Sequence, residues 1–261
     1  MVVGCPKAPP ALHLADNPAE ALVRAYAEAA PGPVYAQFSA VVVTPNSRFT
    51  AAGTLVVSAP NRFRIELRGP IGPPQLVITC DGTAVHAYLA PKNTYFASDD
   101  ASAALSAILG VGSGDGAAVV TSLLLGRVPA LPPVSRVEGA MLVWTRDDGA
   151  RLSMSVDQDT AHLVSATALT ADGTVQFRGD WTPAAFPTAL HAELPGLGAS
   201  ADLSFEQWNV AAPLDAAFSL AAPDGAKIVP LSIYQPEKLI IGSAPLPIPL
   251  GPAPDNIPGG P

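Results

Sequence analysis

The feature that most constrains the fold of this chain is a series of short β-type segments. Residues 63–68 alternate strictly, with Phe63, Ile65 and Leu67 on one side and charged residues on the other. A period of two residues is typical of a strand that buries one face and exposes the other. Asp-Gly pairs, which favour two-residue hairpin turns, separate further segments of this kind at 81–82, 148–149 and 172–173. The pattern predicts about eleven short strands in an antiparallel sheet, curled into a barrel or an incomplete barrel.

Three helices are predicted beside these strands. Asn17 is a favourable N-cap and Pro18 a favourable first residue for an Ala-rich helix over Pro18–Ala29. Two short apolar helices, Ala101–Leu109 and Ala117–Leu125, are expected in the middle of the chain. Because they interrupt the strand pattern, we interpret them as a plug or lid over the open mouth of the barrel.

The domain organisation follows from the distribution of these elements. Residues 17–234 are expected to form one half-barrel domain, since no internal repeat or break divides them. Residues 1–16 contain several prolines and are interpreted as an extended tether. Residues 235–261 are rich in Pro and Gly, a composition that is typical of a disordered tail.

The composition is unusually apolar. Hydrophobic residues make up 49% of the chain and charged residues 14%, against a usual charged share of about a quarter. Such a protein either buries much of its surface or offers apolar surface to a ligand. The formal net charge is -8 and the few basic residues form no cluster, which argues against a nucleic-acid partner. The sequence has no apolar run of about 18 residues, the length that a bilayer-spanning helix needs.

Cys5 is the candidate site of lipid attachment. Residues 2–5 read Val-Val-Gly-Cys, which is similar to a bacterial lipobox, where a small residue precedes the cysteine that is lipidated. The charged and apolar regions of a signal peptide do not precede it, so we expect the natural precursor to have a longer N-terminus. If Cys5 carries lipid, Cys80 is a lone and buried thiol. The alternative interpretation is a chance Val-Gly-Cys near a start.

The sequence contains no convincing motif for catalysis or metal binding. Its four histidines are scattered, and none has a partner at metal-ligand spacing. The glycine-rich segment 110–116 lacks the Lys of a phosphate-binding loop, and Ser113 is not flanked by the glycines of a nucleophile elbow. The carboxylate pairs 99–100 and 147–148 fit helix capping and turn solvation. We therefore expect no enzymatic activity, no metal and no cofactor.

Five short motifs occur in the order and at the spacing of the lipoprotein localization family of LolB and LolA, which the chain resembles. Together they extend over roughly residues 34–210. The first is a strand pattern of proline, aromatic, arginine and apolar residues at Ala59–Leu67, and the second is a Pro-Gly loop at Gly69–Gly72. The others are an entry into a helix at Tyr95–Ala101, a helix end at Leu123–Pro129 and a last Trp-containing strand at Leu203–Trp208. The lipobox is similar to that of LolB, which is itself a lipoprotein.

The chain also departs from the family pattern. Leu123 stands where LolB tends to carry Trp, and the chain continues past Trp208 in a way that is similar to the end of LolA. Ala59 stands where LolA-type carriers often have an Arg that helps hold the lid closed. The resemblance therefore does not support an arginine contact that holds the lid closed in this chain, and it is compatible with a different client protein.

The resemblance implies a fold and a function. The fold is an incomplete antiparallel barrel with helices over its open mouth, enclosing an apolar cavity. The function is that of a lipid-anchored protein of the bacterial outer membrane that faces the periplasm, binds the acyl chains of lipoproteins and helps insert them into the membrane. The partners that it implies are lipoprotein acyl chains, outer-membrane lipid and a soluble periplasmic carrier of the LolA type.

Alternation and the resemblance together give the candidate site residues. The expected lining of the acyl cavity comes from two strands and the two middle helices: Leu55, Val57, Phe63, Ile65, Leu67, Leu105, Ile108, Leu109 and Leu124. Ile71 lies in a loop of Gly and Pro, and the resemblance implies that it enters lipid during transfer, as a Leu does in LolB. The alternative for Ile71 is an ordinary exposed isoleucine.

Two other functions are compatible with the same residues. The fold could carry or sense another amphiphile, or the apolar faces could pack as a filled barrel in a structural envelope lipoprotein. Lipid that co-purifies with protein lacking Cys5 would separate the binding proteins from a filled barrel. The distribution of other lipoproteins after depletion of this protein would separate lipoprotein insertion from a different carrier function.

Overall fold

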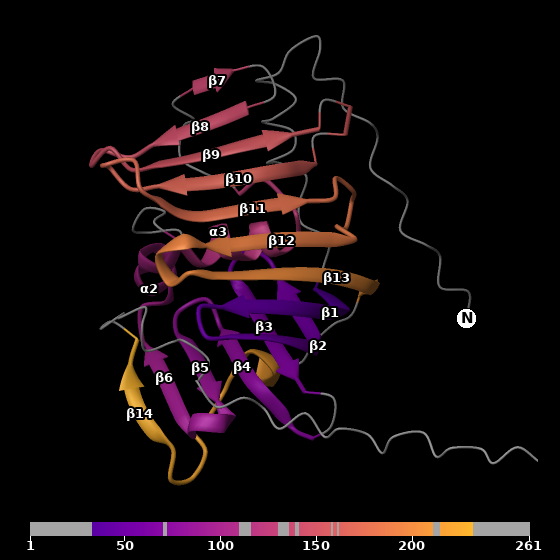
Figure 1. Cartoon of the computed structure of the whole chain (residues 1–261), viewed down its shortest axis with the longest axis vertical. Coiled ribbons are helices and arrows are strands. Elements are labelled where there is room, and N and C mark those ends of the chain that lie inside the picture. Colours follow the sequence, from indigo (N-terminus) through magenta and orange to yellow (C-terminus); the bar gives the residue numbers. More distant parts are fainter. Residues whose placement is uncertain are drawn as a thin grey trace, which may run out of the picture.

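The structure, a computed structural model, describes residues 33–69, 72–109, 116–129, 136–138, 141–157, 159–160, 162–210 and 215–231. These residues form one sheet of fourteen strands, with the helices α2 (Ala101–Leu109) and α3 (Gly116–Leu124) packed against one face (Figure 1). The strands are β1 Val34–Thr44, β2 Ser47–Ser58, β3 Arg62–Arg68, β4 Pro74–Cys80, β5 Val85–Leu89, β6 Thr94–Ser98, β7 Arg136–Glu138, β8 Met141–Thr145, β9 Arg151–Val156, β10 Leu163–Leu169, β11 Val175–Trp181, β12 Ala189–Leu194, β13 Ala199–Val210 and β14 Lys227–Pro230. Single 3-10 turns lie at Ala90–Lys92 (η1), Pro195–Leu197 (η2) and Asp215–Phe218 (η3).

The strand order is β14-β6-β5-β4-β3-β2-β1-β13-β12-β11-β10-β9-β8-β7. The chain builds one half of the sheet from β1 to β6, passes through α2 and α3, and builds the other half from β7 back to β13 beside β1. Neighbouring strands pair antiparallel, apart from β14, which lies parallel to β6. Within the described part of the chain, β14 and β7 are the two edges and do not pair with each other, so the barrel stays open.

The predicted fold class is therefore confirmed, while the predicted number of about eleven strands is too low. One reason is that β7 has only three residues, too few for a two-residue period to stand out. Turns form at the predicted Asp-Gly pairs, where Gly82, Gly149 and Gly173 have φ values of 100°, 88° and 87°, but the strands that they join are separated by four or five residues rather than by two. At the first of these turns, the carboxylate of Asp81 accepts hydrogen bonds from the N–H groups of Thr83 and Ala84, each at 2.8 Å.

The two middle helices form close to their predicted bounds. α2 spans the predicted residues, and α3 begins and ends one residue earlier than expected. Oδ1 of Asp100 accepts a hydrogen bond from the N–H of Ala103 at 2.8 Å and so caps α2. None of the helices in the described ranges is long and apolar enough to cross a membrane. The predicted helix Pro18–Ala29, the tether 1–16 and the tail 235–261 lie outside the described residues, as does most of the glycine-rich segment 110–116.

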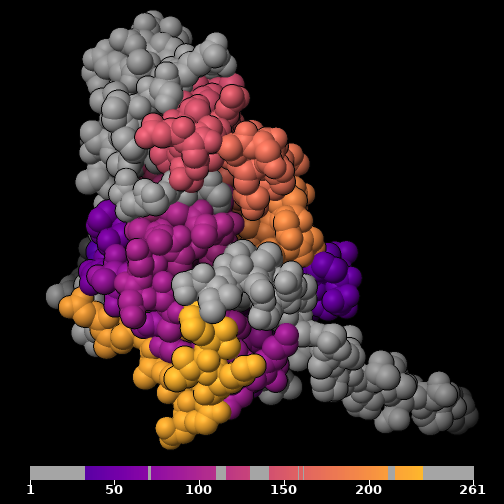
Figure 2. Space-filling model, turned by 90° about the vertical axis from the view of Figure 1, so that its left-hand side faces the viewer, coloured from indigo at the N-terminus to yellow at the C-terminus, as the bar shows by residue number. Residues whose placement is uncertain are grey.

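The hydrophobic core lies on the inner face of the sheet, which is the face that carries α2 and α3. One row of directly paired inner-face residues crosses six strands, through Ala36, Leu55, Ile65, Ile78, Ala87 and Phe96. Seen from the side, the segment from β5 to α3 lies between the strands of the second half and β14 (Figure 2). The helices therefore fill the curve between the two halves of the sheet.

The last described segment, residues 215–231, crosses the outer face of β3–β6 and is called the C-terminal strap below. The Arg64 guanidinium donates to the carbonyl oxygens of Ala217 at 3.2 Å and Ser219 at 3.4 Å. The hydroxyl of Tyr95 donates to the carbonyl oxygen of Leu220 at 2.6 Å. The strap then ends in β14, which extends the sheet beside β6.

Candidate functional site

The cavity-lining residues predicted in β2 and β3 share the inner face of the sheet. Leu55 pairs directly with Ile65, and Val57 pairs with Phe63. Leu67 lies two residues beyond Ile65 and therefore points to the same side. The five side chains form one continuous apolar surface across two neighbouring strands.

Burial divides this surface into two zones. Leu55, Val57 and Phe63 are each 1% exposed and belong to the packed core. Ile65 and Leu67 pack against the core but are only partly buried. Their direct partners in β4 are also partly buried and complete a group that we call the β3–β4 strip: Ile65, Leu67, Leu76 and Ile78. On this part of the inner face the strip is the partly exposed zone, whereas Leu55, Val57 and Phe63 are covered.

The helices α2 and α3, which were predicted as a lid, are likewise divided into buried and partly buried residues. Leu105 and Leu109 of α2 are 7% and 8% exposed and face the core. Ile108 of α2 and Leu124 of α3 are only partly buried. α3 lies against β2 and β3, on the side of the β3–β4 strip. The strip thus lies beside α3, while α2 packs on α3 and on β11.

Close backbone contacts hold the two helices to each other and to the sheet. A Cβ added to Gly116 would lie 2.7 Å from the backbone nitrogen of Ser106, so the start of α3 contacts α2 without an intervening side chain. The indole N–H of Trp181 in β11 donates to the carbonyl oxygen of Leu123 at 2.9 Å. This bond satisfies a carbonyl at the end of α3 and fixes that end on the second half of the sheet.

A row of aromatic rings crosses the centre of the inner face, where the two halves meet. Phe38 contacts Phe205 edge to face at a centroid distance of 5.7 Å, and Phe205 contacts Trp208 at 4.9 Å. Trp208 stacks on Phe186 at 5.1 Å and donates its indole N–H to the carbonyl oxygen of Pro187 at 2.9 Å. Phe205 and Trp208 lie in the Leu203–Trp208 motif, whereas Phe38 and Phe186 were not predicted from the sequence, although alternation in residues 34–40 would have placed Phe38 on the buried side.

The inner face carries little polarity. The buried polar residues in the described ranges are all uncharged, and two of them, Ser58 and Thr79, pair with Arg62 and Arg64 and so lie on the outer face, which leaves Thr94, Ser106 and Thr121. Cys80 is fully buried; its thiol donates to the carbonyl oxygen of Asn61 at 3.3 Å, and burial raises the pKa of that thiol. No group of three or more His, Cys, Asp and Glu residues that could hold a metal occurs in the part of the chain that the structure describes. The surface can bury hydrocarbon by the hydrophobic effect.

Charged side chains lie on the outer face. Glu66 bridges Arg64 and Arg68, each at 2.7 Å. Burial alone would raise the pKa of the Glu66 carboxyl, but hydrogen bonds from Arg68 and Arg64 hold it below its ordinary value. Because these charges alternate with the apolar strip residues along β3, the strand separates a charged outer surface from an apolar inner one.

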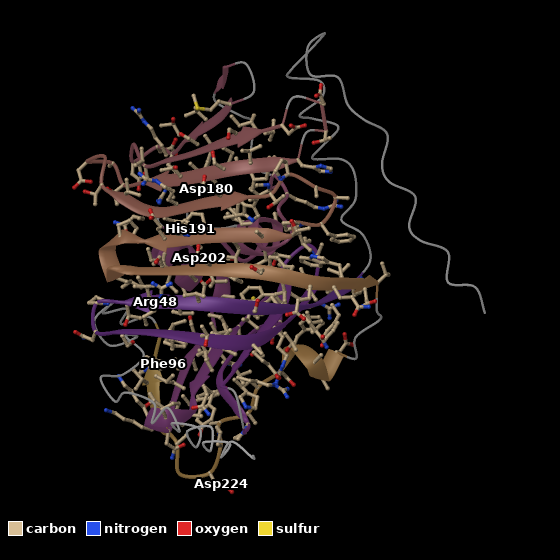
Figure 3. All side chains as sticks on the ribbon, turned by 45° about the vertical axis from the view of Figure 1, so that its right-hand side comes forward. Arg48, Phe96, Asp180, His191, Asp202 and Asp224 are labelled. Atoms are coloured by element: carbon tan, nitrogen blue, oxygen red, sulfur yellow. The ribbon has the colours of Figure 1, made fainter. Side chains whose placement is uncertain are left out.

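A second polar group lies on the other half of the sheet. Asp180, His191 and Asp202 lie one above another on β11, β12 and β13 (Figure 3). Nδ1 of His191 is 2.6 Å from Oδ1 of Asp202, and this hydrogen bond is the main reason that the pKa of His191 is raised. The second ring nitrogen is 3.3 Å from Glu193. The site therefore has an apolar inner face and an ion-paired outer face on both halves.

Two predicted site residues, Cys5 and Ile71, lie outside the described residues. The strands on either side of the Ile71 loop are described, and Arg68 pairs with Pro74 at its base. The loop therefore leaves the sheet at the end of β3 where Leu67 and Leu76 of the strip lie.

No protein-family model and no curated protein sequence matches the chain. Solved structures do. A LolA superfamily protein from Nitrosomonas europaea is 13% identical, with a TM-score of 0.50 over 77% of this chain and 97% of that one. A DUF1329 family protein from Desulfovibrio piger is 13% identical, with a TM-score of 0.51 over 76% of this chain and 94% of that one. The open sheet with its lid helices is therefore a LolA-like fold.

Proposed function

We propose that this chain is a lipid-anchored, non-enzymatic envelope protein that binds acyl chains of lipoproteins on its inner face and helps insert them into the outer membrane. The observation that carries the proposal is the β3–β4 strip, four half-buried apolar side chains on the part of the sheet that α3 contacts. The LolA-like fold agrees with it, since the fold places such a face inside an open barrel.

The chemistry of the strip suits hydrocarbon. An acyl chain in water is unfavourable by about 0.8 kcal/mol per CH₂ group, so a protein that moves lipoproteins must shield most of its length. The partly exposed strip extends along β3 from Leu67 to Ile65, which is about 7 Å at the rise of a strand. An acyl chain that enters there would run along the strand direction, toward Phe63.

The proposed membrane contacts fit the same geometry. Cys5 would carry the lipid anchor, and Ile71 would touch the outer membrane from the periplasmic side. β1 begins at Val34, beside Val57 and thus at the end of β3 opposite the Ile71 loop. The separation is about 20 Å along the strand, whereas the predicted tether over residues 6–16 alone can extend to about 36 Å. The anchor and the loop can therefore reach one membrane together, and a soluble LolA-type carrier is the proposed donor.

The proposal is tested by placing a charge in the strip. Ile65→Glu should abolish binding of a fluorescent fatty acid, because the carboxylate would be desolvated beside Ile78. Ser39→Glu is the matched control, since Ser39 is exposed on the outer face of β1, and it should bind as the parent does. Circular dichroism checks that both variants fold. A folded Ile65→Glu variant with parental affinity, or a parent that binds no fatty acid, would overturn the proposal.

The filled barrel is the second candidate, and the complete burial of Leu55, Val57 and Phe63 favours it. It predicts that full-length protein purified from cells carries no lipid on its inner face. A carrier of another amphiphile would carry lipid, but its depletion would leave the membrane distribution of other lipoproteins unchanged. Fractionation of lipoproteins after depletion therefore decides between that function and lipoprotein insertion.

A further inference from the structure

The ring of Phe38 lies flat on the backbone of the neighbouring strand. Gly53 is the direct partner of Phe38 across β1 and β2. A Cβ built on Gly53 would lie 2.7 Å from Cε1 of Phe38 and nearer still to two other ring atoms. Carbon atoms in contact are normally about 3.5–4.0 Å apart, so any side chain at position 53 would have to lift the ring by roughly 1 Å.

This ring borders the β3–β4 strip. Gly53 pairs on its other side with Leu67, which places the Phe38 ring over β2 and directly beside the strip. Phe38 is 3% exposed, and the helix that lies over β2 and β3 is α3. A lifted ring would therefore move into the space between Leu67 and α3.

The other half of the sheet has an equivalent arrangement. A Cβ added to Gly179 of β11 would lie 2.8 Å from ring atoms of both Phe177 and Trp181. These rings also lie flat along their strand, but their strand is not a neighbour of β3 or β4. A Cβ at Gly179 would displace Trp181, whose indole holds the end of α3, so this position is not independent of the helix beside the strip.

We propose that Gly53 is a specificity-determining residue, which lets long acyl chains pass Leu67 by allowing the Phe38 ring to lie flat. The inference rests on the proposed function and names which chains the site accepts. A chain that enters at Leu67 and Leu76 must run toward Ile65 and Ile78 to be buried along its length. With the ring lifted, a short chain still binds at the entrance, and a long chain leaves its end in water.

The test compares a decanoyl and a hexadecanoyl fluorescent fatty acid on the full chain. Gly53→Ala should weaken hexadecanoyl binding about tenfold, because about two CH₂ groups lose burial, and leave decanoyl binding close to the parent. Gly196→Ala is the control, because Gly196 is exposed and an added Cβ would meet no atom closer than 3.9 Å, and it should leave the ratio of the two affinities unchanged. Phe38→Leu combined with Gly53→Ala should restore hexadecanoyl binding, because leucine has no ring to lift.

The outcomes separate the inference from the proposed function. A folded Gly53→Ala variant with the parental ratio of affinities overturns the role of Gly53, while binding by the parent upholds the function. A parent that binds neither probe overturns both. If Gly53→Ala does not fold, the double variant Phe38→Leu with Gly53→Ala is measured instead. It has no ring to lift, so it should keep the parental ratio of affinities, and a selective loss of hexadecanoyl binding overturns the inference.

Discussion

The guanidinium carbon of Arg62 lies 4.9 Å from the centroid of the Phe218 ring. The same guanidinium contacts the carboxylate of Asp215 at 2.8 Å. Phe218 itself is 2% exposed, although the strap that carries it lies on the outer face of the sheet. The strap is therefore held on the outer face by a small second core, in which the Phe218 ring packs against the Arg62 cation of β3.

We predict that Phe218→Ala lowers the free energy of unfolding by about 3–5 kcal/mol, the usual cost of removing a buried aromatic ring. Asp215→Ala is the comparison, because the Asp215 side chain is 92% exposed and a surface ion pair contributes less than about 1 kcal/mol. Urea denaturation of both variants measures the difference. Equal losses in the two variants would show that the ring does not hold the strap.

The strands and turns could be predicted because their signals are local. The alternation of residues 63–68 and the Asp-Gly pairs depend on neighbours in the sequence, so the sheet, its inner face and both lid helices follow from them. The contact of Arg62 with Asp215 joins positions 153 residues apart. A periodic sequence pattern does not indicate a contact of that kind, so the packing of the strap on the outer face and its core were not predicted.

The candidate site was predicted in part for the same reason. Leu55 and Ile65 have the same position in the alternation and pair directly. Leu55 is fully buried whereas Ile65 is only partly buried, and burial by elements that are distant in the sequence is a tertiary property. Ile78 and Leu76 alternate as clearly as Ile65 does, yet only the register between β3 and β4 shows that they extend the same strip.

Stability should depend on pH through His191. Its hydrogen bond to Asp202 raises the pKa of the imidazole above the ordinary 6.5. A raised pKa in the folded state means that the stabilisation is fully present below about pH 6.5 and is lost as pH rises through the folded pKa. We expect less than about 1 kcal/mol, because ion pairs at the surface are screened by solvent.

Urea denaturation of the parent and of His191→Gln across this pH range measures the effect. The parent should be the more stable protein at low pH, and the two curves should converge as pH rises. Titration of the imidazole by NMR gives the pKa directly. A value at or below 6.5 would contradict the prediction.

Cys5 is predicted to carry the lipid anchor. Mass spectrometry of the protein from its native membrane should show a diacylated or triacylated cysteine as the N-terminal residue. Cys5→Ser should release the protein from the membrane fraction, while Cys80→Ser should not, because Cys80 is a fully buried thiol. An unmodified Cys5 that remains behind Met1 would exclude lipidation.

The last prediction concerns delivery rather than binding. Ile71→Glu should leave folding and fatty-acid affinity at the parental level and slow the transfer of acyl chains to phospholipid vesicles by about tenfold or more. The reason is that one buried isoleucine contributes about 1.5–3 kcal/mol on entering lipid, which corresponds to about tenfold to a hundredfold. That is too little to anchor a protein, but it is enough to hold the loop beside the strip in the bilayer while an acyl chain leaves.

Ile228→Glu provides the control, because Ile228 is an exposed isoleucine, 66% accessible, that lies on the edge strand β14, three strands away from β4. If contact with lipid at the Ile71 loop opens the path for the acyl chain, only the Ile71 variant slows transfer. Equal slowing by both variants would point to a general effect of added negative charge at the vesicle surface. Parental transfer by Ile71→Glu would show that the loop takes no part in delivery.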